Sequence, residues 1–135
     1  MTTMTQSPLD RKARGALAEA AAARFLESEG YLIRERNYVV NHIGEIDLIA
    51  ERGPVIAFVE VKARRDTDIA LPRQQVNPKK QRTIARAALG YVSMNNLRNR
   101  DFRFDIIELY LDHHGEPAKL EHLVHAFEAP KGLFV

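Results

Sequence analysis

The most apolar stretch of the chain, residues 55–63 (VIAFVEVKA), constrains the fold more than any other segment. Its length and its Val, Ile and Phe content predict a central β-strand. Because side chains alternate between the two faces of a strand, Glu60 and Lys62 share one face. Two charged side chains thus lie on a strand that is otherwise suited to burial. A buried carboxylate or ammonium needs a partner or a metal ion, so the pair predicts either an ion pair or a functional site.

The segment before this strand supplies a second carboxylate. Residues 45–51 (EIDLIAE) alternate charged and apolar side chains, which predicts a strand, and Arg-Gly-Pro at 52–54 is typical of a tight turn. In the hairpin that results, Asp47 is expected close to Glu60. Carboxylates from adjacent strands make a hard oxygen site that suits Mg²⁺ or Mn²⁺. A lysine beside them, Lys62, can orient or deprotonate a water molecule or stabilise charge on a phosphate.

Helices and further strands are predicted on both sides of this hairpin. Residues 11–29 are rich in good helix formers and end before Gly30, and Asn77 with Pro78 is suited to begin a second helix that runs to about Met94. The remaining predicted segments are strands at 31–40, 102–112 and 119–127 and a mobile loop at 64–76. As a crossover, the second helix makes the strands at 55 and 102 parallel. The order α-β-β-β-α-β-β predicts an α/β fold with a mixed five-stranded sheet flanked by helices.

Composition and charge narrow the class of protein. The 135 residues suit one domain, which we place at 11–135, after a disordered lead-in at 1–10. The chain has no cysteine, which excludes disulfide bonds and thiolate chemistry. Without an apolar stretch of membrane-spanning length or a signal-peptide core, we expect a cytoplasmic protein with no membrane contact. The net charge of +2 permits nucleic-acid binding without requiring it.

Two ordinary interpretations compete with a functional site. Glu60 and Lys62 on their own are typical of an ion pair on an exposed strand. The apolar run before Glu60 and the sequence GEID at 44–47 favour the functional interpretation. Basic residues gather between 62 and 86, and on charge alone they are either a solvated face or a phosphate-binding surface.

Two ordered motifs resemble the core of the PD-(D/E)xK nucleases: GEIDLIA at 44–50 and FVEVKAR at 58–64. Over residues 11–110 the chain is similar to the YraN-like family of small proteins, itself similar to archaeal Holliday-junction resolvases. The further pieces of this resemblance are Gly15 with Glu19, RNY at 36–38, Lys80 and RFDII at 103–107. The resemblance implies a restriction-endonuclease-like fold and a metal-dependent endonuclease that hydrolyses phosphodiester bonds of DNA, with branched DNA as one candidate substrate.

The resemblance also implies a role for each matched residue. Asp47 is expected to bridge the metal ion, Glu60 to be the second ligand and the backbone carbonyl of Val61 to complete the shell around Mg²⁺ or Mn²⁺. Lys62 is expected to be the catalytic lysine. Ile46 replaces the proline of the motif, and the YraN-like family commonly lacks that proline. Because resolvases of similar fold act as dimers, the resemblance also allows a homodimer.

Further candidates surround this set. Glu19 shares a helix face with Gly15, and it either supports the metal site from the first helix or is an ordinary exposed glutamate. Four residues near or after the catalytic strand are expected to contact phosphates, against the alternative of a polar loop and helix start: Arg64, Gln75, Lys79 and Lys80. The resemblance includes Lys80 and therefore favours the phosphate role.

Other charged residues have simpler interpretations. Arg103 and Asp105 share a strand face and are expected to form a structural ion pair. His122 and His125 are three residues apart, which places them on opposite faces of a strand and argues against joint zinc binding. Three functions stay open: a Mg²⁺-dependent DNA endonuclease, a nucleic-acid-binding module of the nuclease fold that does not cleave on its own, and a structural or interaction domain.

Overall fold

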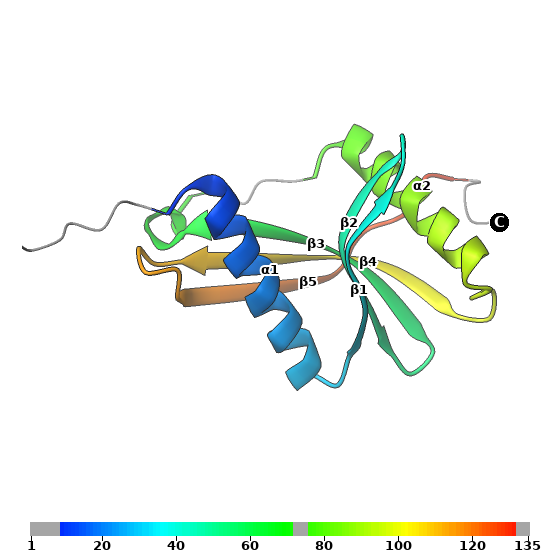
Figure 1. Ribbon diagram of the computed structural model, residues 1–135, viewed down its shortest axis with the longest axis horizontal. Coiled ribbons are helices and arrows are strands. Elements are labelled where there is room, and N and C mark those ends of the chain that lie inside the picture. The colour runs from blue at the N-terminus through cyan, green and yellow to red at the C-terminus, as the bar shows by residue number, and fades with distance from the viewer. Residues whose placement is uncertain (1–8, 72–75, 132–135) are drawn as a thin grey trace, which may run out of the picture.

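The computed structural model describes residues 9–71 and 76–131, which form one five-stranded sheet and two helices (Figure 1). In chain order the elements are α1 (Arg11–Ser28), β1 (Leu32–Val40), β2 (Gly44–Arg52), β3 (Val55–Arg65), the 3₁₀ turn η1 (Asp66–Asp68), α2 (Pro78–Met94), β4 (Asp101–Leu111) and β5 (Pro117–Phe127). The predicted order α-β-β-β-α-β-β is confirmed. β3 runs two residues past its predicted end, so the predicted loop begins later than residue 64.

The helices begin where the sequence provides capping side chains. The carboxylate of Asp10 accepts a hydrogen bond of 2.7 Å from the Ala13 N–H at the start of α1. Asn77 caps α2 in the same way through the Lys80 N–H at 2.8 Å. Gly30 follows α1 with a positive φ of 89°, which glycine adopts without strain. Among the described helices, none is both long and apolar enough to cross a membrane.

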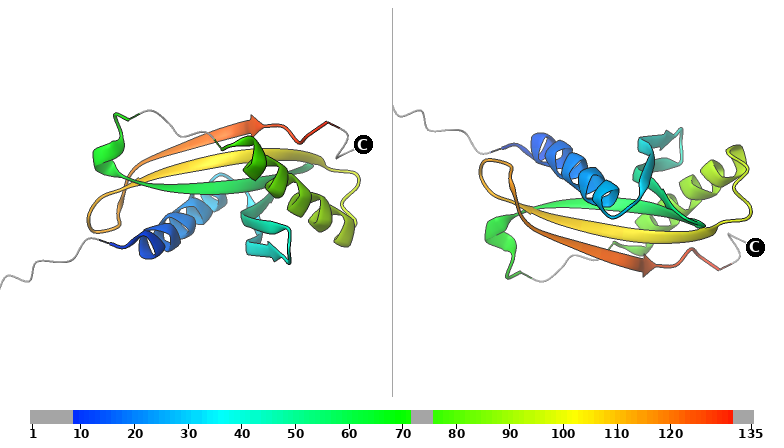
Figure 2. Two further views of the ribbon diagram at one scale, coloured as in Figure 1. Left: turned by 90° about the horizontal axis from the view of Figure 1, so that it is seen from above. Right: turned by 90° about the horizontal axis from the view of Figure 1, so that it is seen from below.

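The strands lie in the order β1-β2-β3-β4-β5, and every neighbouring pair is antiparallel except β3 and β4. α2 makes the crossover that allows this parallel pair, as predicted. Figure 2 shows β3, β4 and β5 as long, gently curved strands, with the β1–β2 hairpin turning out of their plane.

Each face of the sheet buries one helix. Small residues of α1, among them Ala18 and Ala22, let the helix lie close to Val59 and Ile107 on one face. On the other face α2 packs Tyr91 against Phe58, and their rings make an edge contact with centroids 6.3 Å apart. The alternation predicted for β3 is confirmed, since Phe58 and Val59 belong to opposite layers.

The β1–β2 hairpin bends where Asn37 lies opposite Asp47. Asn37 has a φ of 50°, a left-handed conformation that asparagine tolerates better than most residues. On β2, Ile46 packs in the α2 layer and Leu48 in the α1 layer, although residues two apart on a regular strand share a face. β2 therefore twists at Asp47. Its pairing with β3 ends there, at Leu48 opposite Val59.

The bent part of the hairpin is braced by α2. A Cβ added at Gly44 would overlap the γ-methyl group of Thr83, so glycine permits the close approach of β2 and α2. The departure of β2 leaves β3, from Glu60 to Arg65, with no partner strand on that side within the described residues. The open edge of β3 is the structural feature on which the candidate site is built.

Candidate functional site

Asp47 lies at the bend of β2 and faces the open edge of β3. Its Oδ2 atom accepts a hydrogen bond of 2.8 Å from the backbone N–H of Val61. In a strand, the N–H and the C=O of one residue point to the same side, so the Val61 carbonyl faces the same edge. The structure thus brings together Asp47 and the backbone group that the resemblance implied as a metal ligand.

Glu60 lies next to this point and is buried, with 7% of its surface exposed. Its Oε1 atom is 2.7 Å from Nζ of Lys80, which lies in the first turn of α2. The sequence predicted Lys80 as a phosphate contact, and it gave no signal for an ion pair with Glu60. The pairing depends on how α2 docks against the sheet, which residue spacing does not reveal.

Four carboxylates near the start of the open edge of β3 lie close enough to influence one another's pKa, and we refer to Glu19, Glu45, Asp47 and Glu60 as the acidic cluster. Burial raises the pKa of Asp47 to about 7, and repulsion by Glu60 and Glu19 adds to the effect, against the opposing Val61 N–H and Lys80. Burial also raises the pKa of Glu19; a hydrogen bond from Asn37 opposes this effect, and Glu45 and Glu60 reinforce it. The predicted role of Glu19 near the site is therefore consistent with its position.

The chemistry of this cluster suits a divalent cation. Burial lowers the pKa of Lys80, but its hydrogen bond to Glu60 and the attraction of the nearby carboxylates outweigh burial, and the pKa is raised. Lys80 thus provides a positive charge that is paired with Glu60 in this conformation. As arranged here, no three His, Asp or Glu side chains of residues 9–71 and 76–131 are grouped to hold a metal ion. The carboxylates of Asp47 and Glu60 with the Val61 carbonyl still form a hard oxygen donor set, which fits Mg²⁺ or Mn²⁺.

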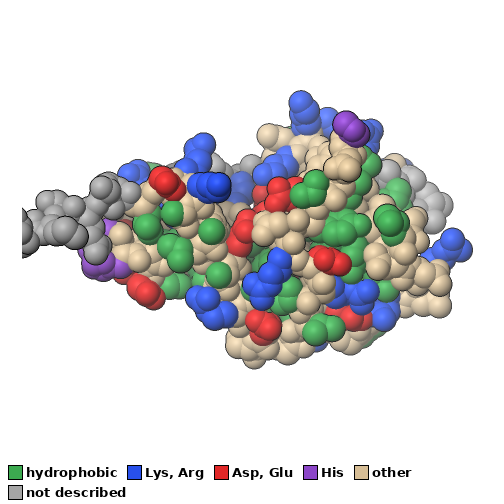
Figure 3. Space-filling model, viewed as in Figure 1, with side chains coloured by type: hydrophobic (Ala, Val, Ile, Leu, Met, Phe, Trp, Pro, Cys, Tyr) green, Lys and Arg blue, Asp and Glu red, His purple; other side chains and the backbone are tan. Residues whose placement is uncertain are grey.

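A groove of about 670 Å³ runs along the open edge of β3 and continues from the acidic cluster. We call it the β3 groove. Its described lining is Arg11, Arg14, Gly15, Glu60, Val61, Lys62, Ala63, Arg64, Arg65, Asp68, Leu71 and Lys80. Six of these are basic, and only two are acidic. On the face shown in Figure 3, some acidic side chains lie near the centre, and others are scattered among lysine and arginine side chains.

The predicted phosphate-binding residues occupy different places. Lys62, Arg64 and Lys80 line the β3 groove, whereas Lys79 is exposed on α2 and Gln75 lies outside the described residues. The guanidinium of Arg64 stacks 5.4 Å from the ring centroid of Tyr110. Sequence reasoning missed the two arginines that the first helix adds to the groove, Arg11 and Arg14, and it included Arg65 only as part of the basic run at 62–86. Their charge was visible in the sequence, but their common location was not.

A second buried carboxylate, Asp105, lies on the face of the sheet that α1 covers. Arg103 donates to both of its oxygens, at 2.9 and 2.8 Å, which confirms the predicted ion pair. The Nε2 atom of His122 is 2.8 Å from Oδ2 of Asp105, and the backbone N–H of His125 donates at 3.0 Å. The ring of His125 instead approaches Glu128 at 3.4 Å, so the two histidine rings have different partners.

Comparison with known proteins supplies the family. Residues 18–109 match the family described as "Uncharacterised protein family UPF0102". A UPF0102 protein of Myxococcus xanthus is 40% identical over 123 residues, which cover 91% of this chain and 95% of that protein. The UPF0102 protein of Dictyoglomus turgidum is 41% identical over 119 residues, with coverages of 88% and 100%. This chain therefore belongs to the UPF0102 family, which confirms the resemblance to the YraN-like proteins.

Proposed function

We propose that this UPF0102 protein is a metal-dependent endonuclease that hydrolyses phosphodiester bonds of DNA. The observation that carries the proposal is the position of Asp47, a half-buried carboxylate with a pKa of about 7 beside Glu60 and Glu19, held by the Val61 N–H. The β3 groove includes Glu60 of this cluster in its lining, and six of its twelve described lining residues are basic. A nuclease needs both parts: carboxylates for a cation that activates the phosphodiester, and basic side chains for the phosphate backbone.

Asp47, Glu60 and the Val61 carbonyl would hold one Mg²⁺ or Mn²⁺. When bound, such an ion polarises the phosphate and lowers the pKa of a coordinated water molecule. Asp47 has to lose its proton to become a ligand. Burial and the neighbouring carboxylates raise its pKa to about 7 in the absence of a metal ion, so the cation competes with a proton and binds more tightly as the pH rises.

The basic residues around the acidic cluster would act on the substrate. Lys62 follows Glu60 by two residues on the same face of β3 and lines the groove. Its ammonium would stabilise the charge on the phosphate or orient the attacking water molecule. Glu19 would hold the site from α1. Lys80 would pair with a phosphate once it leaves Glu60.

The ion pair between Lys80 and Glu60 favours a second candidate function. In this conformation Lys80 occupies one of the two carboxylates expected to bind metal, at 2.7 Å. A nucleic-acid-binding module that does not cleave on its own would show this arrangement permanently, and a homodimer or another partner would then complete the site. A cytoplasmic location belongs to both proposals, because the DNA substrate would be met there.

Cleavage assays with linear duplex, single-stranded and four-way DNA, each with Mg²⁺ or Mn²⁺, test the nuclease proposal. We expect the wild type to cut at least one substrate and Asp47→Asn to cut it at least about a hundredfold more slowly. Asp101→Asn, an exposed carboxylate at the opposite end of the sheet, is the matched control and should cut like the wild type.

Cleavage by Asp47→Asn at the wild-type rate would show that the proposed site is wrong. If the wild type binds DNA in a salt-dependent way and cuts none of the substrates, the binding module replaces the nuclease as the better description.

A further inference from the structure

The β3 groove has an acidic end and a basic end. Its walls are α1 and the open edge of β3, which pack against each other. Glu60 of β3 lines one end of the groove, and Glu60 together with Glu19 of α1 contributes to the raised pKa of Asp47. Arg14 of α1 and Arg65 of β3 line the other part of the groove.

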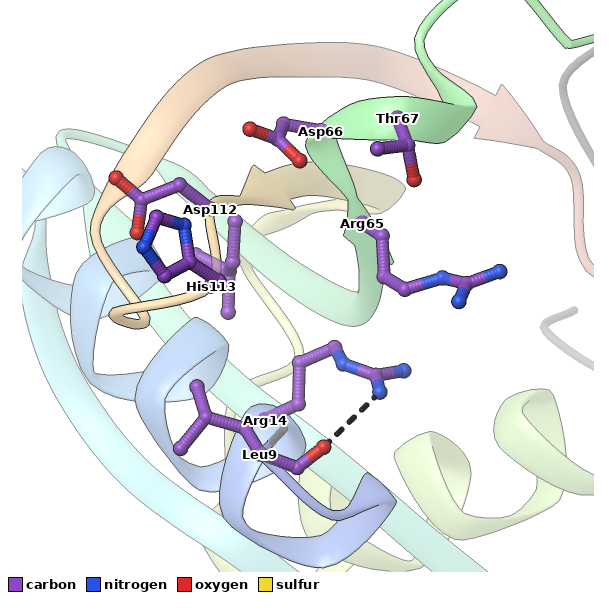
Figure 4. A pocket seen from close by; sticks show the side chains of 8 residues that line it. Leu9, Arg14, Arg65, Asp66, Thr67, Asp112 and His113 are labelled. Carbon is purple, nitrogen blue, oxygen red and sulfur yellow. Dashed lines mark hydrogen bonds between the residues drawn. The ribbon is translucent and has the colours of Figure 1, made fainter. Parts of the chain in front are cut away.

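Arg14 and Arg65, which we call the basic end of the groove, also line a smaller hollow of about 170 Å³ together with Asp66 and Asp112. Figure 4 shows their guanidinium groups extending in the same direction, away from Asp112 and His113. Arg14 donates to the Leu9 carbonyl at 3.2 Å, and Nε of Arg65 is 3.5 Å from a carboxylate oxygen of Asp68. A guanidinium carries several further N–H donors in a planar fork, so both arginines keep donors for a ligand.

We infer that Arg14 and Arg65 form a phosphate clamp, which binds a backbone phosphate of a nucleic-acid strand that runs along the β3 groove from the acidic cluster. The inference rests on the proposed function in one respect, because it takes the other end of the strand to reach the acidic cluster. From Glu60 to Arg65 a strand rises about 16 Å, which separates the clamp from the acidic cluster. The clamp would therefore hold a phosphate of the substrate to one side of the reacting bond and not at that bond.

The shape and lining of the groove favour a polyanion over a small ligand. Sites for small molecules are usually enclosed and mostly apolar, whereas this groove is open and lined mostly by charged side chains. A free phosphate would bind at the basic end alone and would gain nothing from the length of the groove. A strand with regularly spaced phosphates makes use of the arginines along the entire open edge of β3.

Gly15 is a position at which a side chain can be introduced into the groove without disturbing the fold. It lines the groove from α1, and a Cβ added there meets no atom within 4 Å. Gly90 of α2 also has open space around an added Cβ and is not part of the described lining. Because both are helical, the same substitution at Gly90 is a matched control for helix stability.

The first experiment measures binding of a fluorescent single-stranded oligonucleotide by anisotropy at several salt concentrations, with EDTA present so that cleavage cannot occur. Arg14→Gln and Arg65→Gln should each weaken binding about tenfold and reduce the salt slope by about 0.7, the value for one lost phosphate contact on a single strand. Arg24→Gln, an exposed arginine on the same helix, should change neither quantity.

The second experiment separates charge from bulk. Gly15→Glu should weaken binding at least about fivefold more than Gly15→Gln, because a carboxylate in the groove repels phosphates. Gly90→Glu should bind like the wild type. Equal effects of Gly15→Glu and Gly15→Gln, or wild-type binding and salt slope for Arg14→Gln and Arg65→Gln, would overturn the clamp.

The clamp and the nuclease can fail separately. Weaker binding by the arginine variants in a protein that never cleaves would support the clamp and remove the nuclease. Metal-dependent cleavage abolished by Asp47→Asn, with unchanged binding in the arginine variants, would do the reverse. Absence of oligonucleotide binding by the wild type, or displacement by polyglutamate at equal charge concentration, would overturn the clamp as well.

Discussion

Two aspartates of the same sheet, half-buried Asp47 and buried Asp105, have opposite surroundings. Burial raises the pKa of Asp105, but hydrogen bonds from His122, Arg103 and the His125 N–H outweigh it, so that the pKa is lowered. Asp47 accepts one backbone hydrogen bond and faces two further carboxylates, and its pKa is raised to about 7. Burial of an aspartate therefore does not decide its role.

The difference lies in which charges the fold supplies. Around Asp105 the sheet provides a guanidinium, an imidazole and an N–H, so the carboxylate is satisfied within the protein. Around Asp47 it provides like charges, and the ammonium of Lys80, which opposes the raised pKa of Asp47, is paired with Glu60. An ionised carboxylate among like charges lowers the stability of the fold and favours binding of a cation from solution. This arrangement is common at functional sites.

The largest effect on stability is expected from removing Asp105, the aspartate whose charge is satisfied within the protein. Asp105→Ala would leave Arg103, whose side chain is 15% exposed, without its counter-charge. We expect a loss of about 3–5 kcal/mol in the free energy of unfolding, measured by urea denaturation at neutral pH. Asp101→Ala on the same strand is the control and should lose well under about 1 kcal/mol. A similarly small loss for Asp105→Ala would mean that the network contributes little.

Asp47→Asn is expected to change the free energy of unfolding in the opposite direction, that is, to stabilise the protein. Because the folded pKa of about 7 lies above the unfolded value of 3.8, the folded state holds the extra proton between these pH values. Wild-type stability therefore falls as the pH rises through this window, and the penalty is complete above about pH 7. We expect Asp47→Asn to be more stable than the wild type by about 2 kcal/mol at pH 8 and to match it near pH 4.

Urea denaturation at both pH values measures this difference. A variant that is less stable than the wild type at pH 8 would show that the Asp47 carboxylate is satisfied after all. Asp105→Asn provides the contrast, since a lowered pKa makes Asp105 stabilising above its unfolded value of 3.8.

A smaller effect is expected from removing the ammonium group of Lys80, which is paired with Glu60. Lys80→Met should let the protein without nucleic acid bind Mn²⁺ about fivefold more tightly, because the metal ion no longer competes with an ammonium at 2.7 Å. Calorimetric titration measures the affinity, and Lys79→Met, an exposed neighbour on α2, is the control. Weaker Mn²⁺ binding by Lys80→Met would mean that Lys80 supports the metal site.

Local patterns in the sequence predicted the parts of this structure that depend on strand periodicity. Alternation placed Glu60 on the face of β3 opposite to Val59, and it predicted the Arg103–Asp105 pair from a spacing of two. The cap of α2 at Asn77 was also predicted from residue types at adjacent positions, whereas the cap of α1 at Asp10 was not predicted. In these cases the interacting residues are neighbours along the chain.

The remaining features depend on contacts that periodicity does not encode. The bend at Asn37 interrupts a stretch that is otherwise typical of a regular strand, and it is what turns Asp47 toward Val61. The ion pair of Lys80 with Glu60 and the common location of Arg14 and Arg65 follow from how the helices dock. The groove therefore could not be predicted from the sequence, although every charged residue that lines it could be identified there.

The open edge of β3 has a consequence for solubility. A strand with unpaired backbone groups is a template on which another chain can add a strand, the first step of many aggregation reactions. Lys62, Arg64 and Arg65 place positive charge on both faces of this edge, and Asp47 covers the Val61 N–H. Two copies that approach edge to edge would repel each other, so the charges that suit the groove to a polyanion also protect the protein from self-association.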